Sequence, residues 1–299
     1  MAKDIKSLRT RIKSFDSTLH LTGAMGLVAS SKIKRACDAM YASRKYSDGI
    51  SDVTMALAAC PECRKSPYFG LEKKDLENTE EETVSADNNE SARTRLIVIA
   101  GDRGLCGGYN ANVFRTVRTM EAFEIKPIGK RSYDKYHIVD IEGEDEETDA
   151  DETGYLSSER YTYEDALEEA ETCCKDFLEG KIDRVQVVYN RYISIMSQEP
   201  QVIQLLPLER ASVIKDLGSI CEPAPDVIFE DLIPVYFAAK LYALVKESFA
   251  CEVAARRMAM DSAKKNAQQM IDDLKLEYNR ARQSTITQEI TEIVSGAGK

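Results

Sequence analysis

Residues 5–40 read IKSLRTRIKSFDSTLHLTGAMGLVASSKIKRACDAM, and this stretch decides the fold. Apolar or small residues recur in it at alternating steps of three and four, an unbroken seven-residue repeat over about five heptads. Such a repeat predicts a long helix that winds around a second helix in a left-handed supercoil. The repeating positions are Ile5, Leu8, Ile12, Phe15, Leu19, Thr22, Gly26, Ala29, Ile33, Ala36 and Met40.

The same pattern continues toward Ala59 and stops at Pro61. We therefore expect one helix over about residues 4–58, roughly 80 Å long at about 1.5 Å per residue. The residues in the middle of this seam have small side chains, and Gly23 and Gly26 have none. Because each helical glycine costs about 1 kcal/mol relative to alanine, we expect this stretch to be closely approached or to need pliability.

The C-terminal end of the chain carries a second long helix. Residues 235–294 contain no proline and no glycine, and the helix is expected to begin or kink near Pro234. Two such helices at opposite ends of one chain, each with an uncovered seam, are expected to pair with each other. Because the segment between the two helices must carry the chain back along the first one, the second helix is expected to run antiparallel to the first. The seam positions are Met260, Ala263, Ala267, Met270, Leu274, Tyr278, Ala281, Ile286, Ile290 and Ile293.

Between the helices, short apolar runs alternate with helical patterns, which predicts a small, largely parallel sheet covered by helices. We expect strands at 94–100, 125–129, 137–141, 183–195 and 201–208, with a turn near 198–200, and helices at 110–123, 133–136 and 163–178. Residues 142–152 hold eight acids and are expected to form a solvated loop.

The fold class is therefore α/β plus a long antiparallel α-helical coiled coil. The N- and C-terminal helices form a rod, and a small Rossmann-like α/β domain is inserted between them. The expected domain limits are 1–60 for the first helix, 61–93 for a linker, 94–210 for the α/β domain, 211–225 for a second linker and 226–299 for the second helix.

Charge and hydropathy exclude several classes of protein. The net charge is −11; residues 1–47 hold ten Lys and Arg against three acids and residues 247–299 hold eight of each, so the middle carries −18. An acidic middle argues against nucleic acid as a partner. No apolar run approaches the roughly 20 residues of a membrane span. The charged N-terminus also lacks the apolar core of a signal peptide, so neither membrane insertion nor export is expected.

The cysteines do not indicate a metal or a disulfide framework. Eight of them stand at irregular spacing, and without a secretion signal they are expected to be reduced thiols. Cys60 and Cys63 form a lone C-x-x-C, and zinc would need two further ligands that the isolated His20 and His137 do not supply. We expect no metal site.

The glycine-rich residues 101–108, GDRGLCGG, follow the first strand, where a nucleotide would sit in an α/β domain. They match neither the dinucleotide fingerprint nor the triphosphate cradle, since Tyr109 follows Gly108 where a lysine is needed. A tight turn is the expected use of these glycines. Two histidines give no convincing catalytic triad, and Asp272 and Asp273 lie on a charged helix face. We expect no catalytic residue and no cofactor.

Three stretches resemble the gamma subunit of the F-type ATP synthase, of bacterial type. They are IKSLRTRI (5–12) leading to AMGLVASSK (24–32), GDRGLCGGYN (101–110), and MAMD (258–261) with YNRARQ (278–283) and ITQEITEI (286–293). The resemblance covers nearly the whole chain. It departs from the family at Gly23 and Gly26, where Lys and Glu are usual, and it lacks the long cysteine-bearing insert of the chloroplast type.

The resemblance implies a rotor shaft that couples ion flow through the membrane c-ring to conformational cycling of the catalytic beta subunits. The coiled coil would enter a ring of alternating alpha and beta subunits. The α/β domain would contact the epsilon subunit and the c-ring, and all chemistry would belong to the beta subunits. The implied location is peripheral, on the cytoplasmic face of the bacterial plasma membrane.

Seven residues are the candidate site. Met25, from the resemblance, and Arg282, Gln283 and Thr287 are expected to contact a beta subunit. We place the last three on neighbouring positions of one helix face. The Arg282 guanidinium and the Gln283 amide could hydrogen-bond carboxylates of a beta-subunit loop in one orientation of the shaft and release them in the next. The remaining residues are expected to form a bearing tip that turns without directional bonds: Ile290, Ile293 and Val294.

Two other classes stay open from the residues alone. A nucleotide-using α/β enzyme with helical arms would need a phosphate cradle. A non-rotary coiled-coil adaptor would fit the periodicity but would leave the match around Arg282, Gln283 and Thr287 unexplained.

Overall fold

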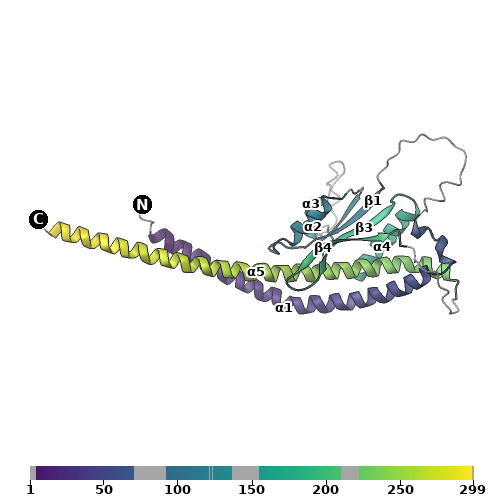
Figure 1. Cartoon of the computed structure of the whole chain (residues 1–299), viewed down its shortest axis with the longest axis horizontal. Coiled ribbons are helices and arrows are strands. Elements are labelled where there is room, and N and C mark those ends of the chain that lie inside the picture. Colours follow the sequence, from purple (N-terminus) through teal and green to yellow (C-terminus); the bar gives the residue numbers. More distant parts are fainter. Residues whose placement is uncertain are drawn as a thin grey trace, which may run out of the picture. The chain divides into compact units, whose positions relative to one another are not determined.

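The computed structural model describes residues 5–70, 92–120, 122, 124–136, 155–209 and 222–297. The chain divides into two compact units. Met1–Lys32 with Arg256–Lys299 is called the helical unit below, and Ile33–Ala255 is called the sheet unit. Two helices pass through both units, α1 (Ile5–Ala58) and α5 (Pro225–Ala297), as the two heptad patterns predict (Figure 1). The second helix continues through Pro234 instead of beginning there.

Within the sheet unit, α1 and α5 lie antiparallel, which confirms the prediction. Lys240 of α5 lies 3.9 Å (Nζ to Oδ1) from Asp48 of α1. Further along α5, Glu247 pairs with Arg44 at 2.8 Å, and Ala250 clusters with residues that lie earlier still in α1. Residue numbers therefore rise along one helix as they fall along the other.

Four strands form the sheet in the order β2-β1-β3-β4. They are β1 (Thr94–Ile99), β2 (Glu124–Ile128), β3 (Arg184–Tyr192) and β4 (Gln198–Leu206). β1 is parallel to β2 and β3, and β4 is antiparallel to β3. The sheet is thus largely parallel, as predicted. The turn between β3 and β4 lies at 193–197 and not at the predicted 198–200. Pro200 lies in β4 opposite Asn190, where an edge strand tolerates the missing N–H.

The sheet buries both of its faces. Ile97 and Ile99 of β1 belong to the larger core, which includes residues of α4, α5 and the end of α1. Leu96 and Val98 belong to a second cluster with residues of α2. Every residue of β1 is buried, as a central parallel strand requires. The helices of the sheet unit are α2 (Tyr109–Val117), α3 (Lys130–Tyr136) and α4 (Tyr163–Leu178), with the short 3-10 helices η1 (Cys63–Lys65) and η2 (Pro67–Phe69).

Some predicted features differ or fall outside the described residues. α2 ends at Val117, well before the predicted residue 123. The expected strand 137–141 and the acidic residues 142–152 lie outside the described part of the chain, as does most of each expected linker. The segment directly after α1 packs into the core through Cys63, Tyr68 and Phe69. Among the described helices, none combines the length and the apolar character that a membrane span requires.

Candidate functional site

In the helical unit, α5 extends beyond its partner helix (Figure 1). A side chain on Gly26 of α1 would meet the Cβ of Met260 at 3.6 Å. Antiparallel progression from this pair puts Ile5 opposite about residue 281. Leu8 of α1 is accordingly buried, and Leu274 is the last buried residue of α5. From about residue 282 onward, α5 has no facing residue in the described part of α1.

Arg282, Gln283 and Thr287 lie on this unaccompanied part, and all three are exposed. At about 100° per residue, Gln283 and Thr287 stand one turn apart on one side of the helix. Arg282 lies about 100° from Gln283 and about 140° from Thr287. The three residues therefore offer two directions of contact and not the single face expected from their spacing. The Thr287 hydroxyl donates to the Gln283 carbonyl oxygen at 2.9 Å, so it is left as an acceptor for a partner.

An exposed apolar stripe accompanies Arg282 toward the C-terminus. The exposed fractions are 45% for Ile286, 55% for Ile290, 70% for Ile293 and 67% for Val294. The three isoleucines lie within about 80° of Arg282 around the helix. The sequence analysis placed Ile286, Ile290 and Ile293 in the seam, but the structure shows all three exposed.

The hydroxyl groups of this helix end are satisfied within the helix. Thr291 donates to the Thr287 carbonyl oxygen at 2.8 Å, and Ser295 donates to the Thr291 carbonyl oxygen at 2.6 Å. The end of α5 therefore offers apolar surface with few hydroxyl donors, which is the property expected of a tip that slides.

On α1, Met25 is half-buried, and three large apolar side chains near it are exposed: Leu21, Leu27 and Val28. The sequence analysis did not single out these three. The available signal was that they are apolar yet stand off the seven-residue repeat. A side chain on Gly23 would have no neighbour within 4 Å among the residues that the structure describes.

The glycine-rich loop has amide groups that are committed inside the chain. The Gly101 N–H donates to Asn110 Oδ1 at 2.9 Å, and the Arg103 N–H points to Glu252 Oε1 at 3.4 Å. A phosphate cradle needs converging amides that are free for a ligand. Leu105, with φ of 61°, completes a tight turn. These two amides are therefore used inside the chain, and the loop turns it from β1 into α2.

The cysteine pair after α1 is part of the core. Cys60 and Cys63 are both buried, and burial raises the pKa of the neighbouring core thiol Cys174 to about 12. Cys174 therefore stays protonated near neutral pH, and burial limits the access of reactants to Cys60 and Cys63. Over the described ranges, no group of three or more His, Cys, Asp or Glu side chains could hold a metal ion.

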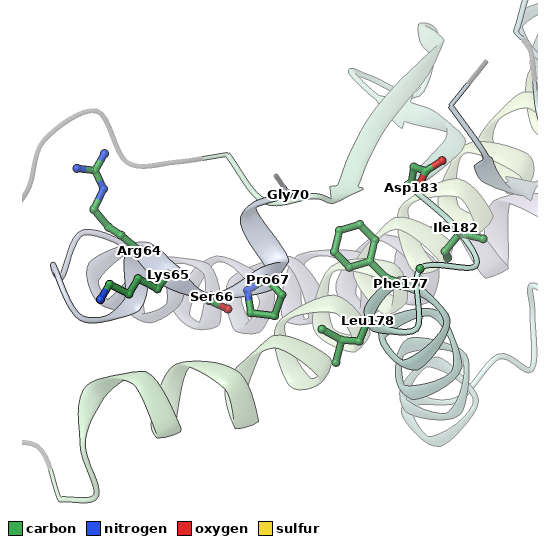
Figure 2. Close-up of a pocket in the computed structure, with 10 residues that line it drawn as sticks. Arg64, Lys65, Ser66, Pro67, Gly70, Phe177, Leu178, Ile182 and Asp183 are labelled. Atoms are coloured by element: carbon green, nitrogen blue, oxygen red, sulfur yellow. The ribbon is translucent and has the colours of Figure 1, made fainter. Parts of the chain in front are cut away.

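A cleft of about 660 Å³ lies between the segment after α1 and the end of α4 (Figure 2). Phe177 and Leu178 supply apolar surface, and Arg64 and Lys65 line its other part. Asp183 is held by Arg93 at 3.2 Å. Among the described residues, the lining of this cleft contains no histidine and no carboxylate besides Asp183, so these residues form no paired acid and base.

The fold and the site together define a class of protein: two long antiparallel helices that carry an inserted α/β domain and expose an apolar helix end. A family model described as ATP synthase matches residues 4–298. The ATP synthase gamma chain of Ruminococcus albus is 36% identical over 311 residues, which covers 98% of each chain. The chain belongs to the gamma-chain family of the ATP synthases.

Solved structures share the fold. A rotor structure of the Euglena gracilis mitochondrial ATP synthase aligns with a TM-score of 0.59 at 16% identity, covering 94% of this chain and 98% of that one. A structure of the same enzyme titled OSCP/F1/c-ring gives 0.62 at 18% identity, covering 98% and 93%. As a gamma chain, this protein is a non-catalytic, peripheral subunit of the central stalk, and the catalytic sites lie in the beta subunits. Neither the nucleotide enzyme nor the adaptor is favoured.

Proposed function

We propose that the unaccompanied end of α5 works inside the head of the ATP synthase. There, Arg282, Gln283 and Thr287 contact one beta subunit at a time, and Ile290, Ile293 and Val294 form the bearing tip. The observation that carries this proposal is the exposed apolar stripe beside Arg282, at a helix end that α1 does not cover. Isolated exposed apolar residues are ordinary, but a contiguous stripe of them is typical of a binding surface.

The chemistry of the two polar residues suits a releasable contact. The guanidinium of Arg282 can donate two parallel hydrogen bonds to a carboxylate on a beta-subunit loop, and the Gln283 amide can add a third. Hydrogen bonds to charged groups contribute about 1.5–3 kcal/mol each. Bonds of this size, made in one orientation and absent in the next, give the shaft preferred stopping angles.

An asymmetric shaft acts on identical partners by presenting a different face to each. It shifts a beta subunit between conformations only by the difference in its contacts with them. Ion flow supplies about 2.3 kcal/mol per charge per 100 mV, so several charges are needed for each step. The Met25 region of α1, with exposed Leu21, Leu27 and Val28, is the second surface proposed to meet the beta subunits.

The α/β domain is proposed to meet the epsilon subunit and the c-ring, while the alpha and beta subunits surround the helices. Solved relatives whose titles name a rotor, F1 and a c-ring support this arrangement. The bacterial relative supports a peripheral position on the cytoplasmic face of the plasma membrane.

The test is Arg282→Ala with Gln283→Ala in the assembled enzyme. The double variant loses all three proposed bonds, and the loss of even one bond of about 1.5 kcal/mol corresponds to about tenfold. Steady-state ATP hydrolysis and ATP-driven ion pumping should therefore fall at least about tenfold. The matched control is Gln288→Ala with Glu292→Ala, which removes exposed polar side chains that lie about 80° to 180° around the helix from Arg282 and Gln283. Deletion of residues 296–299 should cost little, since it leaves the apolar tip in place.

Assembly is checked by sedimentation before rates are compared. If the Arg282 and Gln283 variant assembles fully and keeps rates within about twofold of wild type, the proposed contact is wrong. Equal losses in the control would show that any shortened side chain on this helix impairs the enzyme.

A further inference from the structure

α5 carries a polar segment that a coiled-coil seam does not require. Within the sheet unit, four residues of 247–252 with polar or thiol side chains are buried, each of them 6% exposed or less: Glu247, Ser248, Cys251 and Glu252. Burying polar groups is costly unless each finds a hydrogen-bond partner. All four residues have contacts with the sheet, with α2 or with the glycine-rich loop, and together they are called the α5 clamp.

Two clamp residues hold the end of β3. The Tyr192 backbone N–H donates to Glu247 Oε1 at 2.8 Å. The Cys251 thiol points to the Asn190 carbonyl oxygen at 3.3 Å. The same Glu247 oxygen also pairs with Arg44 of α1 at 2.8 Å. One carboxylate therefore joins both long helices to the sheet.

The other two clamp residues hold α2 and the loop before it. The Tyr109 hydroxyl donates to the Ser248 carbonyl oxygen at 2.9 Å and lies 2.7 Å from the Ser248 hydroxyl. Burial raises the pKa of Tyr109 well above its ordinary value, so the phenol remains a donor. Glu252 faces the Arg103 N–H at 3.4 Å.

The close approach of Glu252 explains why this loop begins with a glycine, Gly101. A side chain there would come within 2.7 Å of the Glu252 carboxyl carbon, closer than any real contact of a Cβ. Cys106 and Tyr109 then pack against Cys251. The glycine-rich sequence 101–110 is therefore shaped to dock on α5, which gives this motif a structural role within the chain.

We propose that the α5 clamp transmits torque between the α/β domain and the two helices of the sheet unit. The inference rests on the proposed function of the chain as a rotor. Apolar contact is non-directional and permits sliding, whereas hydrogen bonds fix angle and register. A load that turns the domain about α5 must break buried bonds whose partners would be left unsatisfied. The clamp residues are positioning residues, because they touch neither nucleotide nor ion.

The first experiment measures the clamp directly in the full chain. Hydrogen exchange is followed at the Tyr192 amide in wild type, Tyr109→Phe, Glu247→Gln and the double variant. The control is Tyr189→Phe, which removes a buried hydroxyl bonded at 3.2 Å to Gln201 within the sheet. Each weakened clamp bond should speed exchange at Tyr192 up to about tenfold, and the control should leave it unchanged.

The second experiment measures coupling in the assembled enzyme in ion-tight vesicles. With the gradient collapsed, the double variant should hydrolyse ATP within about twofold of wild type. Against an opposing gradient, its ions pumped per ATP should fall at least about threefold, because the domain slips under load. Tyr189→Phe should keep the wild-type ratio. A merely structural defect would lower hydrolysis and pumping in proportion.

Faster exchange at Tyr192 with an unchanged pumping ratio would overturn the proposal. An unchanged exchange rate at Tyr192 in every clamp variant would also overturn the proposal, because the clamp hydrogen bonds would then not hold the end of β3. Tyr109→Phe alone removes only one oxygen atom. If the double variant does not assemble, exchange at Tyr192 and the number of ions pumped per ATP are compared between this single variant and wild type. Failure of the rotor function itself would look different: vesicles reconstituted without this chain would pump as well as the complete enzyme.

Discussion

Arg95 offers the sharpest test of what stabilises the α/β domain. It lies in β1 with its side chain 6% exposed, and its guanidinium donates to Glu124 and Asp176, each at 2.7 Å. A third contact reaches the Cys173 sulfur at 3.7 Å. Arg95→Met would keep the apolar stem and remove the charge, so two carboxylates beside the core would lose their main cation.

The loss of stability expected for Arg95→Met follows from the burial of this ion pair. Removing one partner of a buried ion pair typically costs about 3–5 kcal/mol. Lys181 remains 3.1 Å from Asp176, and Lys126 remains 3.7 Å from Glu124. Because these lysines partly replace the lost cation, we expect a loss of about 2–3 kcal/mol, which is at or just below the lower limit of that range. For a unit of this size, the melting temperature should fall by roughly 5–10 °C.

The contribution of Asp176 to the free energy of unfolding depends on pH in a definite direction. The hydrogen bond from Arg95 is the main cause that lowers the pKa of Asp176 below its ordinary value. A carboxyl group with a depressed folded pKa adds stability above its unfolded pKa, and this stability is lost as the pH falls through the folded pKa. Below about pH 4, wild type should therefore lose stability more steeply than Arg95→Met.

The assay is urea unfolding of the full chain, monitored for the α/β domain at several pH values. Arg93→Met is the matched control, because Arg93 pairs with Asp183 at 3.2 Å but both side chains are more than 40% exposed. The control should cost less than about 1 kcal/mol. Asp176→Asn added to Arg95→Met should restore part of the loss. Equal costs for Arg93→Met and Arg95→Met would refute the reasoning from burial.

Four further outcomes are expected. Gly129→Ala should destabilise the sheet unit by more than about 3 kcal/mol, since φ is 92° and the new Cβ would strike the Ala100 carbonyl oxygen; a melting curve equal to wild type would contradict this. Gly23→Ala should gain about 0.5–1 kcal/mol in helix stability by thermal unfolding, because no neighbour obstructs the methyl group. Cys63→Ser should leave ATP hydrolysis and its response to a dithiol reductant unchanged, because that thiol is buried; a redox response lost in the variant would show the thiol to be active. The purified chain should hydrolyse no ATP above a buffer blank, whereas an alpha–beta assembly without it should lose coordinated multi-site turnover.

Much of the fold could be predicted because its elements are local. The seven-residue repeat gave both long helices, and the apolar run at Leu96–Ile99 gave the central strand. The boundaries were less certain, because turns depend on which strand an edge residue meets. Pro200 marked a turn by its local preference, yet it lies in β4 opposite Asn190.

The candidate site shows the same division. The residue types at Arg282, Gln283 and Thr287 were readable from the sequence, and so was the apolar tip. Their two directions of contact follow from the spacing in a helix, but their exposure became clear only from the length of helix that extends past α1. The exposed apolar residues near Met25 were missed because the repeat directs attention to the seam.

The sequence by itself determined the helical periods, the alternation of strand and helix, and the family. Tertiary structure alone decided what the glycine-rich motif does. Tyr109 and Ser248 are 139 residues apart in the chain, so no local pattern could indicate that they meet. Periodicity reports interactions between residues a few positions apart, whereas the partner of a buried hydroxyl or carboxylate is fixed only when distant segments pack together.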